Sequence, residues 1–303
     1  MKSDCQASIA PERITFRTGA DLRLALPKGR MLEGVLSLLA GAGIRVRQAE
    51  RDYRALFSLP GWEVKLLKPQ NIVEMLDSGT RDLGFAGADW VAELGADLVE
   101  VLDTGLDPVS LVAAAPAAIL EDGALPVRPL VVATEYVRLG SRWTETLSLP
   151  ARLVRSYGAT EVFPPEDADC IIDNSATGST LRANGLVIVQ ELLKSSTRLY
   201  ASRCAWADPV RRGRIEELAM LLSAVLEARN RVMLEVNIPA DRVAELVAIL
   251  PCMREPTLSP LSGQGGFAVK AAVPRSELPL VIPRIRRCGG TDIVVSEPSQ
   301  ILP

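Results

Sequence analysis

The feature of this sequence that most constrains its fold is a repeated alternation of short apolar runs with helical patterns. Residues 22–26 form the first apolar run, and a helical pattern follows over residues 32–39. Further strand-like runs lie at residues 62–67, 83–87, 111–115, 130–133, 151–154, 170–172 and 199–205. Because strands that alternate with helices pair mostly in parallel, the pattern predicts an α/β fold with a mainly parallel, doubly wound sheet in each of two lobes.

The sequence also indicates where the chain divides. Residues 116–129 contain several Pro and Gly residues and are predicted to form a hinge and domain boundary. Beyond a helical pattern at residues 215–228, strand and helix patterns between residues 231 and 296 predict a small βαβ-type unit, in which Pro283 is expected to kink the second helix. Nothing in this unit indicates chemistry, so we interpret it as a regulatory or dimerising module. Residues 1–20 are predicted to be a partly ordered tail.

Charge and composition exclude several classes of partner. The 303 residues carry a net charge of -3, with no domain-wide basic surplus that would neutralise nucleic acid phosphates. No apolar run reaches membrane-spanning length, and the first residues lack the apolar segment of a secretion signal. The five cysteines are far apart, which argues against disulfides or a zinc site. We therefore expect a cytoplasmic protein that binds neither nucleic acid nor membranes.

The chain contains no histidine. Histidine-based triads, histidine metal sites and histidine general bases are therefore excluded. Any metal has to be held by oxygen ligands, which favours Mg2+ carried largely by a phosphorylated substrate rather than a metal site built from the protein.

A polar stretch after residues 170–172 is the main candidate site. Asp173 ends this apolar run, and the small residues that follow lead to a helical turn, stopped by Gly185. Free N–H groups and hydroxyls of such a loop can bind a phosphate, and a carboxylate at the strand end can accept hydrogen bonds from ribose hydroxyls. The alternative is an ordinary strand-to-helix turn in which Asp173 is a cap.

Two other strand ends carry charged residues. Lys28 and Arg30 follow the first strand and lie beside the start of a helix, where anions are favoured. Asp89 follows a glycine-flanked strand end, a position that borders ligands in open α/β sheets. Solvated basic residues and a helix-starting acid are the alternatives for these positions.

Five segments together closely resemble the long form of the ATP phosphoribosyltransferase family, the enzymes that begin histidine biosynthesis. The segments are residues 25–30, 82–90, 173–185, 255–261 and 289–293. The resemblance implies a two-lobed, periplasmic-binding-protein-like catalytic core and a C-terminal ACT-like regulatory domain. Lobe I would comprise residues 21–115 and 199–228, lobe II residues 116–198, and the ACT-like domain residues 229–303. It also implies a homo-oligomer, from dimer to hexamer.

The reaction implied by the resemblance joins N1 of the ATP adenine to C1 of phosphoribosyl pyrophosphate and releases pyrophosphate in the presence of Mg2+. Such chemistry depends on charge stabilisation and positioning more than on a strong base. We therefore expect Asp173 to hold the ribose hydroxyls and Lys28 and Arg30 to neutralise phosphates across the cleft, with Asp89 near the nucleotide. The 5-phosphate is expected at Thr177, Gly178, Ser179, Thr180 and Leu181.

The resemblance also implies that histidine is a feedback inhibitor bound by the last domain. The residues expected at its pocket are Asn237, Met253, Thr257, Thr291 and Asp292. The family often carries an acidic residue where Asn237 stands. The alternatives to the whole interpretation are a two-lobed protein that binds a small anion and a catalytically idle regulatory paralogue.

Overall fold

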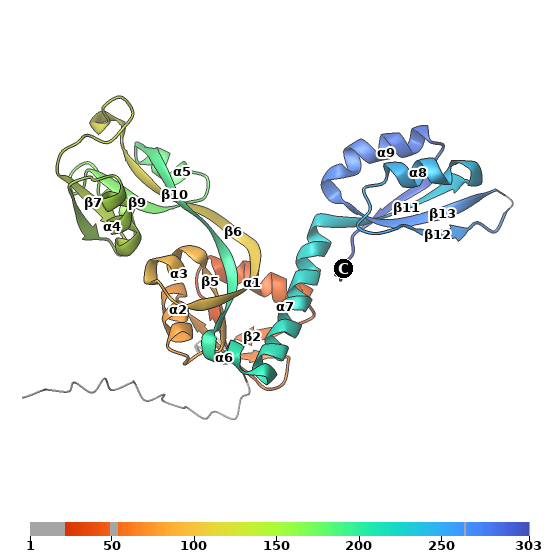
Figure 1. Cartoon of the computed structure of the whole chain (residues 1–303), viewed down its shortest axis with the longest axis horizontal. Coiled ribbons are helices and arrows are strands. Elements are labelled where there is room, and N and C mark those ends of the chain that lie inside the picture. The colour runs from red at the N-terminus through yellow and green to blue at the C-terminus, as the bar shows by residue number, and fades with distance from the viewer. Residues whose placement is uncertain (1–21, 49–53, 264, 303) are drawn as a thin grey trace, which may run out of the picture.

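The computed structural model of the chain describes residues 22–48, 54–263 and 265–302. They form a ten-stranded sheet and a separate four-stranded sheet. Figure 1 shows two lobes joined by the long strands β6 (Leu98–Pro116) and β10 (Leu186–Ser202), and a further unit at the end of the long helix α7 (Pro209–Asn230). The predicted tail, residues 1–20, lies outside the described residues.

Lobe I is built around three parallel strands in the middle of its sheet. Strand β1 is almost fully buried because it pairs in parallel with β4 on one side and β5 on the other. Its apolar core joins Leu24 and Phe85 to Leu199 and Ile215, so residues 199–225 pack against the first part of the chain. The strands of lobe I are β1 (Leu22–Pro27), β2 (Val46–Gln48), β3 (Arg54–Phe57), β4 (Trp62–Leu67) and β5 (Leu83–Gly87). Its helices are α1 (Met31–Gly41), α2 (Pro69–Asp77), α3 (Ala88–Leu94), α6 (Arg203–Ala207) and α7.

Lobe II has its own core, which includes Val132, Trp143 and Ile172. Strand β7 lies between β8 and β9 and pairs in parallel with both. The elements of lobe II are η1 (Ala117–Ile119), β7 (Leu130–Thr134), α4 (Val137–Thr146), β8 (Ala151–Arg155), η2 (Thr160–Val162), β9 (Cys170–Ser175) and α5 (Ser179–Ala183).

The prediction of a mainly parallel sheet in each lobe needs correction. One mixed sheet runs through both lobes, because β6 and β10 are antiparallel to each other and to their neighbours β9 and β5. These two strands also connect the lobes, whereas the predicted hinge at residues 116–129 contains η1 and a turn. The sequence indicated only their most apolar ends, since Gly105 and Pro108 suggest a turn and the middle of each strand is half-exposed.

Helix α7 connects lobe I with the C-terminal unit. The Asp208 carboxylate accepts the N–H groups of Val210 and Arg211, which begins the helix, and Pro209 stands in its first turn. Apolar residues of α7 such as Leu218 and Leu222 pack into the lobe I core. Among the described residues no helix, α7 included, is long and apolar enough to span a membrane.

The C-terminal unit is an antiparallel sheet with helices on one face (Figure 1). Alternate residues of β11, such as Leu234 and Val236, are buried in its core, while Glu235 and Asn237 lie on the opposite, open face. The strand order is β12-β13-β11-β14. The elements are β11 (Arg231–Pro239), η3 (Ala240–Arg242), α8 (Val243–Ile249), β12 (Thr257–Pro260), β13 (Gly266–Pro274), η4 (Arg275–Glu277), α9 (Leu278–Arg287) and β14 (Thr291–Ser296).

One strand of this unit differs from the expected βαβ pattern. Strand β12 is additional, and it was not predicted because all four of its residues are exposed and carry no apolar alternation. Helix α9 contains Pro283 in its interior, and the kink expected at this proline stays a prediction.

Candidate active site

The candidate phosphate loop follows β9 in lobe II. The strand begins with the buried residues Cys170 to Ile172 and becomes exposed as it reaches Asn174. Gly178 has a φ of +70°, a conformation that L-residues other than glycine adopt at a cost, and it precedes the single turn of α5. The Thr177 hydroxyl lies 3.0 Å from the Ser179 hydroxyl, and the Arg182 guanidinium donates to the Thr177 carbonyl. The loop is thus held in shape by its own polar groups.

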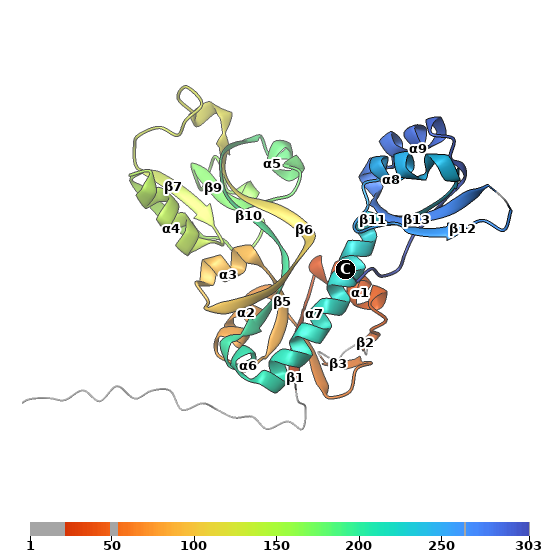
Figure 2. The ribbon, with the colours of Figure 1, turned by 45° about the vertical axis from the view of Figure 1, so that its right-hand side comes forward.

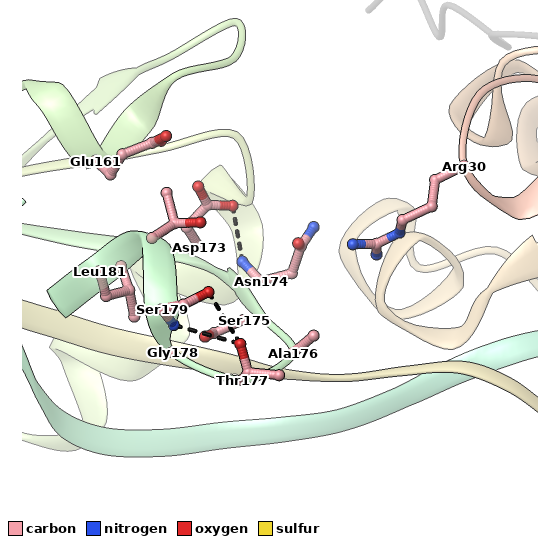
Figure 3. Close-up of a pocket in the computed structure, with 11 residues that line it drawn as sticks. Arg30, Glu161, Asp173, Asn174, Ser175, Ala176, Thr177, Gly178, Ser179 and Leu181 are labelled. Atoms are coloured by element: carbon pink, nitrogen blue, oxygen red, sulfur yellow. Dashed lines mark hydrogen bonds between the residues drawn. The ribbon is translucent and has the colours of Figure 1, made fainter. Parts of the chain in front are cut away.

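The end of β9 and the loop that follows it line a cavity of about 330 Å3 that opens between the lobes. Figure 3 shows the loop on one side and Arg30, from the start of α1 in lobe I, on the other side, pointing toward it. The lining residues are Arg30, Glu161, Asp173, Asn174, Ser175, Ala176, Thr177, Gly178, Ser179, Thr180 and Leu181. The fold therefore brings together Asp173, Arg30 and the five predicted phosphate-loop residues.

Asp173 has an unusual electrostatic environment. Burial, and next the nearby carboxylates of Glu135 and Glu161, raise the pKa of its carboxyl to about 6, against the lowering effect of hydrogen bonds from the Asn174 N–H and the Thr160 hydroxyl. Burial also raises the pKa of Glu135. The anionic form of Asp173 is therefore poorly stabilised by the protein itself, and a cation or a hydrogen-bond donor on a ligand would stabilise it.

Lys28 and Asp89 do not line this cavity. Lys28 follows β1, where its N–H donates to the Leu67 carbonyl, and it is partly exposed. Asp89 is in the first turn of α3, is 4% exposed, and accepts hydrogen bonds from the Ser195 and Tyr136 hydroxyls. Both of its carboxylate oxygens are thus already bonded within the protein.

Of the residues expected to bind an effector, three form a cluster. The Asn237 amide donates to the Asp292 carboxylate over 3.0 Å, and the Thr291 hydroxyl donates to the same oxygen over 2.9 Å. Thr257 lies on β12, separated from β11 by β13, and Met253 precedes β12, with its N–H bonded to the Ala272 carbonyl. The structure thus brings Asn237, Thr291 and Asp292 into direct contact but does not bring Met253 or Thr257 into the same hydrogen-bond cluster.

Besides Ser175, sequence reasoning missed two polar residues of the cavity, Glu161 and Asn174. Glu161 belongs to η2, a separate turn that only the folding of lobe II brings beside Asp173. Asn174 adjoins the predicted carboxylate, and its position at the end of a strand could have indicated it. Both provide oxygen atoms, as does Asp173, and such ligands suit Mg2+. Within the described residues, no group of three or more acidic, cysteine or histidine side chains could hold a metal unaided.

Two lobes joined by antiparallel crossing strands, with a polar loop facing an arginine across the cavity between them, define a two-lobed α/β protein with a polar cavity between its lobes. Comparison with known proteins gives the family. The family HisG, described as ATP phosphoribosyltransferase, matches residues 68–224, and the HisG C-terminal domain matches residues 228–299. The chain belongs to the ATP phosphoribosyltransferase family of enzymes.

Individual relatives agree with this assignment. The chain is 35% identical over 287 residues to an ATP phosphoribosyltransferase of Pelotomaculum thermopropionicum, covering 93% of this chain and 99% of that one. It is 36% identical over 291 residues to the enzyme of Desulforudis audaxviator, with the same coverage of each chain. A solved ATP phosphoribosyl transferase (HisG:HisZ) complex from Thermotoga maritima superimposes with a TM-score of 0.60 at 24% identity, covering 68% of this chain and 98% of that chain, which shows the shared fold.

Proposed function

We propose that this enzyme transfers the phosphoribosyl group of phosphoribosyl pyrophosphate to N1 of the adenine of ATP and releases pyrophosphate, as the first step of histidine biosynthesis. The observation that carries the proposal is the cavity in which Asp173 and the loop from Thr177 to Leu181 face Arg30 of the other lobe. Family membership supports the choice of substrates.

The loop supplies the phosphate subsite. The N–H groups and hydroxyls of Thr177, Ser179 and Thr180 bind the 5-phosphate, with Gly178 allowing the close turn and Leu181 anchoring it in the lobe II core. Because Leu181 is buried and the Thr177 and Ser179 hydroxyls are hydrogen-bonded, the loop is in place before a ligand arrives. Positioning of this kind lowers the entropic cost of bringing the reacting atoms together.

Asp173 binds the ribose hydroxyls next to the phosphate. As the bond from C1 to pyrophosphate breaks, positive charge develops on the ribose, and a carboxylate near the ring stabilises it. Arg30 offsets the negative charge of pyrophosphate or of the ATP phosphates, and Lys28, at the end of the same strand–loop segment, contributes at longer range. These three residues are the proposed catalytic set.

A divalent cation fits the acidic side of the cavity. Asp173 and Glu161 would hold Mg2+ through carboxylate oxygens, together with the substrate's phosphate oxygens and water. When bound, Mg2+ offsets the charge of the leaving pyrophosphate and of Asp173 itself.

The C-terminal unit, residues 229–303, is the proposed regulatory domain, and lobe I (residues 21–115 and 199–228) and lobe II (residues 116–198) form the catalytic core. Histidine binds at Asn237, Thr291 and Asp292, whose carboxylate suits the ligand's ammonium group. Met253 and Thr257 are proposed as further contacts, Thr257 from β12 and Met253 from the segment that precedes it. Truncation near Ala228 is expected to abolish inhibition by histidine.

We further propose that the enzyme works in the cytoplasm as a homo-oligomer, from dimer to hexamer. The thiols of Cys170, Cys204, Cys252 and Cys288 are free, which fits a reducing compartment. Exposed apolar residues on the outer strands β12 and β14, Leu258 and Val294, offer surface for subunit contacts. Analytical ultracentrifugation with and without histidine tests the assembly.

Pyrophosphate release tests the activity. Purified enzyme with ATP, phosphoribosyl pyrophosphate and Mg2+ is expected to release pyrophosphate, and omission of either substrate or addition of histidine is expected to suppress it. Binding of phosphoribosyl pyrophosphate without turnover would identify an anion-binding protein or an idle paralogue instead.

A further inference from the structure

The two lobes share a buried junction that adjoins the cavity at Asn174. In Figure 2, α3 of lobe I and α4 of lobe II lie to the left of the crossing strands, while α5 lies to the right. Two acids on one face of α3, Asp89 and Glu93, reach lobe II at this junction. Both are almost fully buried, with 4% and 6% exposure, so the carboxyl oxygens of each must be satisfied by the groups it contacts.

Glu93 holds the start of α4. Its carboxylate oxygens accept the N–H groups of Arg138 and Leu139, each over 2.9 Å. These are N–H groups of the first helical turn, which have no partner inside the helix, so an acid of lobe I caps a helix of lobe II. This contact fixes the position of Tyr136, the residue just before the helix.

Asp89 continues the junction toward the cavity. The Tyr136 hydroxyl donates to Asp89 Oδ2 over 2.6 Å, and the Tyr136 ring stacks on Trp90 with 4.7 Å between ring centroids. Ser195 donates to the other oxygen of Asp89 over 2.8 Å. A Cβ atom at Gly87 would lie 2.1 Å from Asp89 Oδ1, so the close approach of this carboxylate to the end of β5 requires glycine.

The chain of hydrogen bonds ends in the cavity. The Asn174 amide donates from Nδ2 to the Tyr136 oxygen over 2.9 Å, and Asn174 lines the cavity beside Asp173. Tyr136 has one hydroxyl hydrogen, which it donates to Asp89 in a hydrogen bond. Towards Asn174 the tyrosine oxygen can therefore only be an acceptor. The Asn174 NH2 group must therefore face Tyr136, which leaves its carbonyl oxygen Oδ1 available to a ligand.

We propose that Asp89 and Tyr136 are positioning residues that fix the Asn174 amide so that Oδ1 accepts a hydrogen bond from a ribose hydroxyl of the bound substrate. The proposal rests on the proposed function, since it places the ribose beside Asp173. Asp89 belongs to lobe I and Asn174 to lobe II, so the orientation of a substrate-binding group depends on the correct apposition of the lobes.

A double-mutant cycle tests whether Tyr136 acts through Asn174. Tyr136→Phe and Asn174→Ala are each expected to lower kcat/KM for phosphoribosyl pyrophosphate about tenfold, because the amide is lost or no longer held in place. The double variant is expected to be no worse than Asn174→Ala alone. Additive losses would show that Tyr136 acts independently of Asn174 and would overturn the proposal.

Asp89→Asn provides a second test that removes no atoms from the buried site. With its oxygen toward Ser195, the new amide would donate to the Tyr136 oxygen, the tyrosine would donate to Asn174, and the Asn174 amide would present NH2 to the cavity. Asp89→Asn is therefore expected to lower kcat/KM as much as Asn174→Ala does. When the two substitutions are combined, kcat/KM is expected to be no lower than with Asn174→Ala alone. A folded Asp89→Asn variant with kcat/KM within about twofold of the wild type would also overturn the proposal.

Two controls separate this role from general stability and from the proposed function. Tyr200→Phe removes a phenol hydroxyl from another deeply buried tyrosine, 4% exposed, and is expected to leave kcat/KM unchanged. Thermal unfolding of each variant shows that losses of activity occur in folded protein. If the wild type itself releases no pyrophosphate, the proposed function fails; if it does and the cycles are additive, only the positioning role fails.

Discussion

Asp173 in lobe II and Asp292 in the C-terminal unit are both candidate ligand-binding acids, but the protein treats them differently. Burial beside Glu135 and Glu161 raises the pKa of Asp173 to about 6. Hydrogen bonds from Asn237 and Thr291 lower the pKa of Asp292 below its usual value. The anion of Asp292 is thus stabilised within the protein, while that of Asp173 gains most when a cation or donor binds. The stabilised anion of Asp292 suits a regulatory site that only binds a ligand. The poorly stabilised anion of Asp173 suits a site that uses binding energy for chemistry.

The largest expected effect is at Asp173. Asp173→Ala and Asp173→Asn are each expected to reduce kcat by about 100- to 1,000-fold, because the developing charge on the ribose loses its carboxylate. Pyrophosphate release is the measurement. Asp167→Asn, an exposed acid of the same lobe, is the control and is expected to retain full turnover. Near-normal turnover of the Asp173 variants would show that Asp173, like Asp292, is not needed for catalysis.

Substitution of Arg30 tests the side of the cavity that faces the loop. Arg30→Ala is expected to raise KM for the substrates by about tenfold, since a charge-assisted hydrogen bond to phosphate is lost, and Arg30→Lys is expected to recover part of the loss. Arg45→Ala, an exposed arginine of lobe I away from the cavity, is the matched control. An equal effect of both alanine variants would indicate long-range electrostatics rather than a contact from Arg30.

The regulatory side of the comparison depends on Asp292. Asp292→Ala is expected to weaken inhibition by histidine by about tenfold without changing turnover in its absence, because the ligand's ammonium group loses a charged acceptor. Inhibition curves measure this, with Asp241→Ala as an exposed control in the same unit. A loss of basal activity in Asp292→Ala would mean that the two acids are not functionally separate.

The smallest expected effect is on the free energy of unfolding, in which the two aspartates can be compared directly. Because the folded state raises the pKa of Asp173, the native protein binds that proton more tightly than the unfolded chain does, and the ionised group lowers stability. This penalty is fully present above about pH 6 and disappears as pH falls toward the usual carboxyl pKa near 4. Asp173→Asn is therefore expected to stabilise the ligand-free protein by about 1–2 kcal/mol at pH 7.5 and by less at pH 4.5.

Urea unfolding at the two pH values measures this difference. Asp292→Asn should show the opposite sign, since the lowered pKa of Asp292 means that its anion stabilises the fold above the usual carboxyl pKa. If Asp173→Asn is instead destabilising at pH 7.5, the folded protein stabilises the anion of Asp173, and the raised pKa is wrong.

The sequence predicted the elements whose residues interact mainly with near neighbours. The fully buried β5 and the parallel strands β1 and β7 appear as short apolar runs, since both of their faces are covered. The polar loop after β9 was predictable as a loop too, because its hydroxyls and glycine are consecutive in the chain, while its binding of a phosphate stays a prediction. The long strands β6 and β10 were not, since their middle sections are stabilised by pairing with each other rather than by an apolar pattern.

What the sequence alone determined is therefore the fold class, the resemblance to the family and the polar groups of the loop after β9. Only the tertiary structure decided which other groups meet that loop. It brought Arg30, which stands 143 positions before Asp173, to the opposite side of the cavity. It also gave Asp89 a buried place in a chain of hydrogen bonds rather than a place in the cavity lining. The reason is physical: strand, helix and turn propensities act over a few residues, while burial, pKa and hydrogen-bond polarity depend on groups that only folding brings together.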